Sequence, residues 1–269
     1  MKYVFTDLDG TLLTKDGLTQ EAIDHCLAYQ QRGNRLILAS GRNEKSVEGF
    51  VESLQLERYK GALILVNGEV YIDYDIHERI EVKPLTKKEA IKLVRLADLM
   101  LFRIYIVTKE GRYTYSLLYE SLFYFARLII KHKPIPKLTR IRLKDLPEEV
   151  QKIELSPTFF FKYFVRIYSK LIDSKYEVVS VGPYWVEVLP KGVSKANMVN
   201  YYLNKHQIQR DDVYIFGDGE NDIGMLKLTD HSYTPENGAK LVKQYAKRVI
   251  GNSNDLSVSK EIERIGKEG

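Results

Sequence analysis

Two aspartates, one residue apart, follow a short apolar run at the start of the chain. Asp7 and Asp9 come directly after residues 3–5, which have the composition of a short buried strand. If the extended backbone continues, both side chains point to the same face. Neighbouring carboxylates repel each other unless a cation lies between them, and an oxygen-only site of this kind suits Mg²⁺. Because a carboxylate can also attack phosphorus, the pattern indicates Asp7 as nucleophile and Asp9 as general acid/base.

The same segment has two simpler interpretations, a polar turn after a strand or the start of a calcium loop. A calcium loop of the EF-hand type needs a Glu at its twelfth position. Counted from Asp7, that position is Leu18, so the calcium interpretation fails. The polar turn remains an alternative.

A second group of acidic residues occurs late in the chain. Asp218, Glu220 and Asp222 follow an apolar run at residues 212–216 and precede a predicted helix. Three acids so close together are unusual for a simple turn, and their oxygens suit Mg²⁺. Asp218 is a candidate direct ligand, and Asp222 a ligand that binds directly or through water. Asn221 could hold a phosphate group or a metal-bound water.

The elements that must position these residues alternate regularly at the start of the chain. Residues 35–39 predict a second strand, and helices are expected over residues 18–32 and 44–54. This strand–helix alternation with short links predicts a parallel sheet with right-handed crossovers. Ser40 then falls at the same carboxyl edge as Asp7. At a helix entrance its hydroxyl could hold a phosphate oxygen or simply cap the helix.

Lys195 begins a predicted helix that Ser194 can cap. A cation is unfavourable there, because that end of a helix already carries positive partial charge. The arrangement makes sense if an anion lies beside it, so Lys195 is a candidate for binding phosphate and for screening the charge on Asp7. Lys191 is a weaker candidate.

The two acidic motifs resemble those of a known enzyme group. Asp-Leu-Asp-Gly-Thr resembles the first motif of the haloacid dehalogenase (HAD) superfamily of phosphatases, and Gly-Asp-Gly-Glu-Asn-Asp resembles the fourth motif of its Cof-type branch, subclass IIB. Ser40 and Lys195 stand where the second and third motifs are expected, although Ala196 replaces the glycine usual after that lysine. The resemblance also implies that Asn67, in an Asn-Gly pair, contacts substrate.

The resemblance implies an α/β fold, with a Rossmann-like parallel-sheet HAD core and an inserted α/β cap domain that sets substrate specificity. The strict alternation of elements ends near Pro84, and a mixed run of strands and helices follows. We therefore expect the catalytic core to comprise residues 1–83 and 184–269, and the cap to comprise residues 84–183.

The implied activity is that of a Mg²⁺-dependent phosphatase, which hydrolyses a small phosphomonoester (a sugar phosphate or a nucleotide-type metabolite) through an aspartyl-phosphate. A phosphomutase of sugar phosphates is one alternative, and a phosphosugar-binding regulator with vestigial activity is another. The resemblance implies that the metal is held by Asp7, the Asp9 carbonyl and Asp218, with Asp222 nearby, and the phosphate by Ser40, Lys195 and Asn221.

The composition sets the remaining expectations. The chain has 269 residues, 44% apolar and 29% charged, which is ordinary for a soluble globular protein. No apolar run approaches the roughly 20 residues of a membrane span, and the first strand begins too early to leave room for a signal peptide. The single cysteine, Cys26, excludes an internal disulfide and a thiolate metal cluster. We expect a cytoplasmic protein with no membrane partner.

Seven basic residues lie between positions 127 and 144 with no acid between them. They could line a groove for a phosphorylated substrate or for nucleic acid, or form an ordinary solvated face. Nucleic acid is the less favoured partner of this protein, which we expect to act on a small phosphorylated metabolite. Neither the physiological substrate nor the oligomeric state can be read from the sequence.

Overall fold

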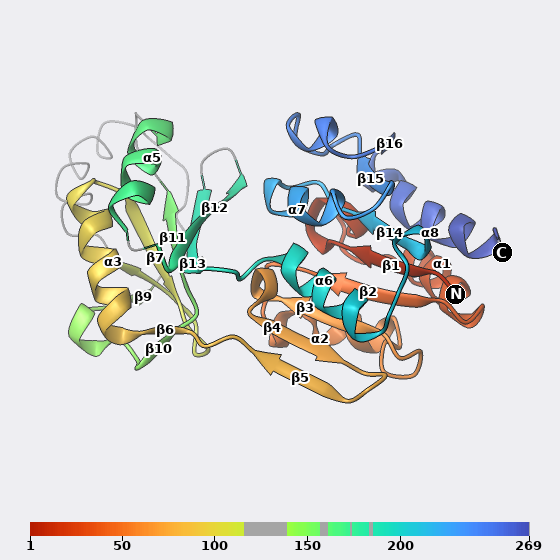
Figure 1. The fold of residues 1–269 in the computed structure, drawn as a ribbon, viewed down its shortest axis with the longest axis horizontal. Coiled ribbons are helices and arrows are strands. Elements are labelled where there is room, and N and C mark those ends of the chain that lie inside the picture. The colour runs from red at the N-terminus through yellow and green to blue at the C-terminus, as the bar shows by residue number, and fades with distance from the viewer. Residues whose placement is uncertain (116–138, 157–160, 173, 183–184, 269) are drawn as a thin grey trace. The chain divides into compact units, whose positions relative to one another are not determined.

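The chain divides into two compact units. A computed structural model describes residues 1–115, 139–156, 161–172, 174–182 and 185–268 (Figure 1). One unit comprises Met1–Val82 with Val193–Gly269, and the other comprises Lys83–Gly192.

The first unit is built on an eight-stranded sheet. From one edge to the other its strands are β16 (Arg248–Ile250), β15 (His231–Pro235), β14 (Val213–Phe216), β1 (Tyr3–Thr6), β2 (Arg35–Ala39), β3 (Ala62–Leu65), β4 (Val70–Asp73) and β5 (Glu78–Glu81). Neighbouring strands from β16 to β3 run parallel, and β4 and β5 extend the sheet as an antiparallel hairpin. The predicted α/β class with a central parallel sheet is confirmed.

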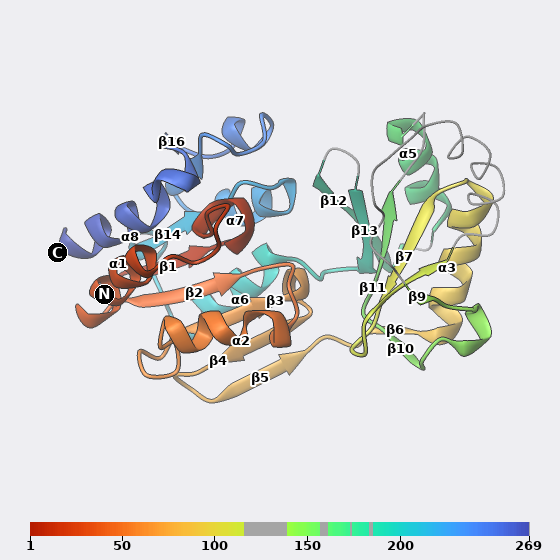
Figure 2. The same ribbon diagram turned by 180° about the vertical axis from the view of Figure 1, so that it is seen from behind.

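Helices cover both faces of this sheet (Figures 1 and 2). Val4 and Leu36 face helices α1 (Gln20–Gln31), α2 (Glu44–Ser53) and α8 (Ser257–Lys267). The alternate residues, Phe5 and Ile37, face α6 (Lys195–Lys205) and α7 (Ile223–Leu226). This side-chain alternation buries every residue of the central strands except Tyr3 and Arg35, which are half-buried. Each large apolar side chain so buried stabilises the fold by roughly 1.5–3 kcal/mol.

The parallel register aligns the ends of three strands. Thr6 at the end of β1 lies between Phe216 of β14 and Leu38 of β2. The backbone N–H of Asp7 donates to the carbonyl of Phe216 at 3.0 Å, which continues the ladder by one residue. The segments that follow β1 and β14 therefore leave the sheet side by side, and Ser40 follows β2 at the same edge.

The second unit is a six-stranded sheet with helices packed on one face. Its strands, in spatial order, are β12 (Tyr176–Gly182), β13 (Trp185–Pro190), β11 (Lys152–Ser156), β7 (Arg103–Val107), β8 (Arg112–Tyr115) and β9 (Thr139–Arg140). Helices α3 (Lys87–Leu99) and α5 (Phe161–Leu171) pack against Ile104, Ile153 and Val188 of the sheet. A short pair, β6 (Leu85–Thr86) with β10 (Glu149–Val150), completes the described part of the unit.

Two expectations about the chain's organisation differ from the structure. We expected the core to resume at residue 184, but β13 pairs with β11 and β12, so the first unit resumes at Val193. The sequence also predicts a helix over residues 237–247, opened by Asn237-Gly238, and this prediction is wrong. The structure has a short 3-10 turn there, Val242–Gln244, and the backbone N–H of Ala239 donates to the carbonyl of Asp218 at 3.0 Å.

The remaining expectations concern single segments. Cys26, in a segment predicted to be helical, is expected to be a small buried apolar residue, and in the structure it is fully buried. Residues 127–138 of the basic stretch lie outside the described residues, while Arg142 forms an ion pair with Asp145 at 2.5 Å. Among the residues that the structure describes, no helix is both long and apolar enough to cross a membrane.

Candidate active site

The backbone turns sharply after Asp7. Leu8–Leu12 form a tight helical turn, in which Gly10 has a φ of 79°. A Cβ atom at Gly10 would overlap the carboxylate of Asp218, so a side chain fits there neither by conformation nor by space. This turn begins at Leu8, between the two aspartates, so the extended backbone does not continue to Asp9. The two aspartates consequently differ: the side chain of Asp7 is 10% exposed and that of Asp9 is 59% exposed.

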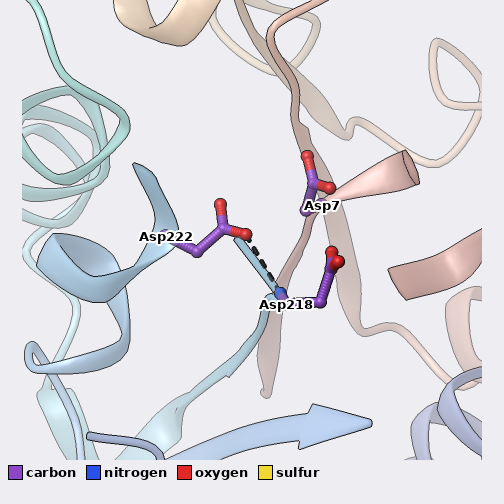
Figure 3. A group of neighbouring side chains, drawn as sticks. All are labelled: Asp7, Asp218 and Asp222. Atoms are coloured by element: carbon purple, nitrogen blue, oxygen red, sulfur yellow. Dashed lines mark hydrogen bonds between the residues drawn. The ribbon is translucent and has the colours of Figure 1, made fainter. Parts of the chain in front are cut away.

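Three carboxylates, including that of Asp7, gather at the carboxyl edge of the sheet. One ligand atom from each of Asp7, Asp218 and Asp222 lies within 4.8 Å of the others (Figure 3). The loop after β14 is held by Asp222, whose Oδ2 accepts hydrogen bonds from the backbone N–H groups of Asp218 and Gly219, each at 3.0 Å. A Cβ at Gly217 would lie 2.5 Å from that of Asp222, so glycine permits this close turn. The structure thus brings the first and fourth motifs together.

Lys195 lies in the middle of this acidic group. Its Nζ donates to Asp7 Oδ1 and to Asp222 Oδ1, both at 2.7 Å, and its side chain is fully buried. Ser194 caps the helix, with its hydroxyl accepting from the N–H of Asn197 at 3.1 Å. Burial alone would lower the pKa of Lys195, but the attraction of Asp222 and Asp7 outweighs burial and raises it. Lys195 therefore stays cationic, and the anion expected beside it is the pair of carboxylates.

Burial and crowding shift the pKa values of two of these acids. Burial raises the pKa of Asp7 to about 7, although Lys195 opposes the shift. Burial also raises the pKa of Asp218 to about 6, opposed by a hydrogen bond from Thr11 Oγ1 at 2.7 Å. One cation, Lys195, does not compensate three buried or half-buried carboxylates, and a divalent cation would favour their ionised forms.

The donor set fits Mg²⁺, because it consists only of oxygens. Both oxygens of Asp222 already accept hydrogen bonds, from Lys195 and from the backbone. Among the described residues, Asp7 Oδ2 and Asp218 Oδ2 accept none, since Lys195 and Thr11 use the other oxygen of each carboxylate. These two atoms could bind a metal directly.

Ser40, Asn67 and Asn221 form a connected chain of polar groups. The backbone N–H of Asn67 donates to the carbonyl of Ser40 at 3.1 Å, and Asn221 Nδ2 donates to Asn67 Oδ1 at 3.0 Å. The Ser40 Oγ accepts from the N–H of Arg42 at 3.2 Å, which leaves the hydroxyl proton to be donated. Asn67 adopts a left-handed conformation with a φ of 57°, one that asparagine tolerates better than most residues.

Three residues near the site were missed by the sequence analysis. Arg42 binds the Asp9 carboxylate through two hydrogen bonds, of 2.7 and 2.6 Å. Asn237 Nδ2 donates to the Gly10 carbonyl at 2.7 Å, and Thr11 binds Asp218 as described above. Position in the motif could have pointed to Arg42 and Thr11, but no sequence signal links Asn237 to Gly10. Lys191, the weaker lysine candidate, lies in the second unit.

Comparison with known proteins identifies the family. The model of the haloacid dehalogenase-like hydrolases matches residues 4–262. The chain belongs to this family. The resemblance to the Cof-type branch of the HAD superfamily is thereby confirmed.

Related proteins and solved structures match this chain over almost its whole length. A Streptococcus pyogenes protein named "Putative phosphatase" is 27% identical, over 98% of each chain. Pyridoxal phosphate phosphatase YbhA of Escherichia coli is 22% identical, over 97% of each chain. The HAD subclass IIB sugar phosphatase BT4131 has the same fold, with a TM-score of 0.75, 20% identity and 99% of each chain covered. The prediction of a HAD-type phosphatase is confirmed by these comparisons.

Proposed function

We propose that this HAD-family enzyme is a Mg²⁺-dependent phosphatase that hydrolyses a small phosphomonoester through an aspartyl-phosphate on Asp7. The observation that carries the proposal is the environment of Asp7. One oxygen, Oδ1, accepts a hydrogen bond from Lys195 at 2.7 Å, and the other, Oδ2, accepts none from the described residues and would bind the metal. A buried carboxylate that one cation orients, and that a metal would hold at its other oxygen, is suited to act as a nucleophile.

The phosphate would be bound by donors that surround Asp7. Lys195 supplies positive charge, and Ser40 and Asn221 supply a hydroxyl and an amide. Asn67 fixes the amide of Asn221 through the hydrogen bond at 3.0 Å and would contact the substrate itself. Phosphoryl transfer depends mainly on positioning and charge compensation, which this set of residues provides.

The first chemical step transfers the phosphoryl group to the enzyme. A carboxylate oxygen of Asp7 forms a bond to phosphorus while the bond from phosphorus to the leaving oxygen breaks, and Asp9 donates a proton to that oxygen. In the second step Asp9 takes a proton from water as the water oxygen bonds to phosphorus. The bond between phosphorus and Asp7 then breaks, which regenerates the carboxylate and releases inorganic phosphate.

The metal would be held by Asp7, Asp218 and the backbone carbonyl of Asp9, with Asp222 as a ligand directly or through water. When bound, Mg²⁺ supplies charge neutralisation and orientation of the phosphate. The involvement of Asp222 in holding Lys195 and two backbone N–H groups favours the indirect role for this residue.

The second unit, Lys83–Gly192, would act as the cap that sets substrate specificity. Its fold differs from that of the first unit, and it interrupts that unit between Ser40 and Lys195. The names of the relatives, a pyridoxal phosphate phosphatase and a sugar phosphatase, support a small phosphorylated metabolite as substrate. A cytoplasmic location remains a prediction.

The experiment is the hydrolysis of p-nitrophenyl phosphate with Mg²⁺ and with EDTA. We expect Mg²⁺-dependent turnover in the wild type and its loss in Asp7→Asn. Asp24→Asn, the same substitution at an exposed position of α1, should retain full activity. Turnover undiminished in Asp7→Asn would refute the proposal. A strong dependence on an added sugar bisphosphate would instead indicate a phosphomutase.

A further inference from the structure

Asp9 is the one acidic candidate of the site that has no buried partner. Lys195 orients Asp7, Thr11 orients Asp218, and the backbone orients Asp222. Asp9 instead has a side chain that is 59% exposed. A free aspartate at such a position samples several rotamers, and fixing one of them costs conformational entropy.

The Asp9 carboxylate is nevertheless held at both oxygens. Arg42 Nε donates to Oδ2 at 2.7 Å, and its terminal nitrogen donates to Oδ1 at 2.6 Å. Arg42 supplies all the hydrogen bonds that the carboxylate receives from the described part of the chain. Two parallel bonds from a planar guanidinium fix the plane of a carboxylate as well as its position, which a lysine cannot do.

Arg42 is itself fixed by its neighbours in the first unit. Its backbone N–H donates to Ser40 Oγ at 3.2 Å, and its carbonyl accepts from the N–H of Val66 at 3.0 Å. Its guanidinium lies over the ring of Phe50, 5.3 Å from the centroid. The orientation of Asp9 is thus set by the segments that follow β2 and β3 and by α2, and not by the turn to which Asp9 belongs.

We propose that Arg42 is a positioning residue, which holds the Asp9 carboxylate in the orientation that proton transfer requires. This inference rests on the proposed function. A carboxylate has about four lone-pair sites, so two bonds to Arg42 leave sites at which a proton can be carried. General acid/base catalysis needs the two heavy atoms within about 3 Å of each other, and small displacements are costly.

The consequence depends on the leaving group. Phenolate is a poorer leaving group than p-nitrophenolate, so hydrolysis of phenyl phosphate depends more on the proton from Asp9. The ratio kcat/KM covers the steps up to departure of the alcohol. Loss of the two hydrogen bonds from Arg42 to Asp9 should therefore lower kcat/KM more for phenyl phosphate than for p-nitrophenyl phosphate. A merely structural role of Arg42 would reduce both rates by the same factor.

The test compares Arg42→Gln, Asp9→Asn and the double variant on both substrates in saturating Mg²⁺. We expect Arg42→Gln to lower kcat/KM for phenyl phosphate about tenfold or more, which is part of the roughly 10²–10⁴-fold that acid/base catalysis typically contributes. In the Asp9→Asn background, the same change should have no further effect. Arg42→Lys, which keeps the charge and loses the fork, should resemble Arg42→Gln. Arg264→Gln removes a comparable Arg–Glu pair on α8 and should leave both rates unchanged.

Three results would overturn the inference: an equal loss for both substrates, a further loss in the Asp9→Asn background, or no loss in Arg42→Gln. Thermal melting of each variant shows whether it folds. If Arg42→Gln does not fold, the same comparison is made with Arg42→Lys. Failure of the proposed function would look different, because Asp7→Asn would then retain the activity of the wild type.

Discussion

The pH dependence of stability offers a direct test of the electrostatics around Asp7. Burial raises the pKa of Asp7 to about 7, against 3.8 in the unfolded chain. The fold therefore favours the protonated form. The stability that this group contributes is fully present below the unfolded pKa and is lost as the pH rises through the folded pKa. The window lies between about pH 4 and pH 7.

The Asp7→Asn variant carries no charge at this position, so it does not lose this contribution to stability as the pH rises. At about 1.4 kcal/mol per pKa unit, a shift of about three units amounts to about 4 kcal/mol, which is an upper bound for such a buried pair. In metal-free buffer we expect Asp7→Asn to be more stable than the wild type by a few kcal/mol at pH 8. The difference should shrink as the pH falls and vanish near pH 4.

The assay is urea unfolding in EDTA at several pH values, followed by far-ultraviolet circular dichroism. Tryptophan fluorescence is unsuitable, because the single tryptophan, Trp185, lies in the second unit and Asp7 lies in the first. Asp24→Asn, with an exposed carboxylate on α1, should show no such trend. The reasoning would be refuted if Asp7→Asn were less stable than the wild type at pH 8. It would also be refuted if the difference in the free energy of unfolding were the same at every pH.

Three further predictions concern the metal and the residues around it. Mg²⁺ should raise the melting temperature of the wild type, by the equivalent of about 2.7 kcal/mol at 100 times its Kd. Calorimetry should show a much smaller rise in Asp218→Asn, and an equal rise would exclude Asp218 as a ligand. Lys195→Met should abolish phosphatase activity and cost about 3–5 kcal/mol in urea unfolding at pH 8, because it leaves Asp7 and Asp222 unpaired; a smaller cost at pH 5 would fit the protonation of Asp7, whose pKa burial raises to about 7. Gly10→Ala should weaken Mg²⁺ binding in titration calorimetry at least tenfold, since its Cβ would overlap the Asp218 carboxylate, and unchanged binding would argue against the proposed ligand.

The sequence predicts which strands carry the site, because strand ends can be read from local patterns. The apolar runs before Asp7 and before Gly217 identify β1 and β14, and parallel strands end at one edge of a sheet. Nothing more than that rule is needed to expect Asp7 and Asp218 close together. The position of Lys195 at a helix start likewise predicts a neighbouring anion, since the helix end is already positive.

Contacts between segments far apart in the sequence could not be predicted in this way. The backbone N–H of Ala239 donates to the carbonyl of Asp218, and the helix expected over residues 237–247 does not form. The hydrogen bond from Asn237 to Gly10 has the same character. Helix propensity is a weak preference that such contacts override. Both contacts fix loops of the candidate active site, so the helix prediction failed in a segment whose backbone conformation is set by that site.

The position of Asp9 shows how a turn between two acidic residues changes the chemistry that a motif can perform. Alternation along an extended strand would place both aspartates on one face, where their charges would compete for the same cation. The turn that begins at Leu8, between the two aspartates, ends the extended backbone and separates them. Asp7 is left buried beside Lys195, and Asp9 is carried to Arg42. A nucleophile must stay ionised, whereas an acid/base must exchange protons with substrate and water. Two carboxylates of identical chemistry can take these different roles because the turn places them in different surroundings.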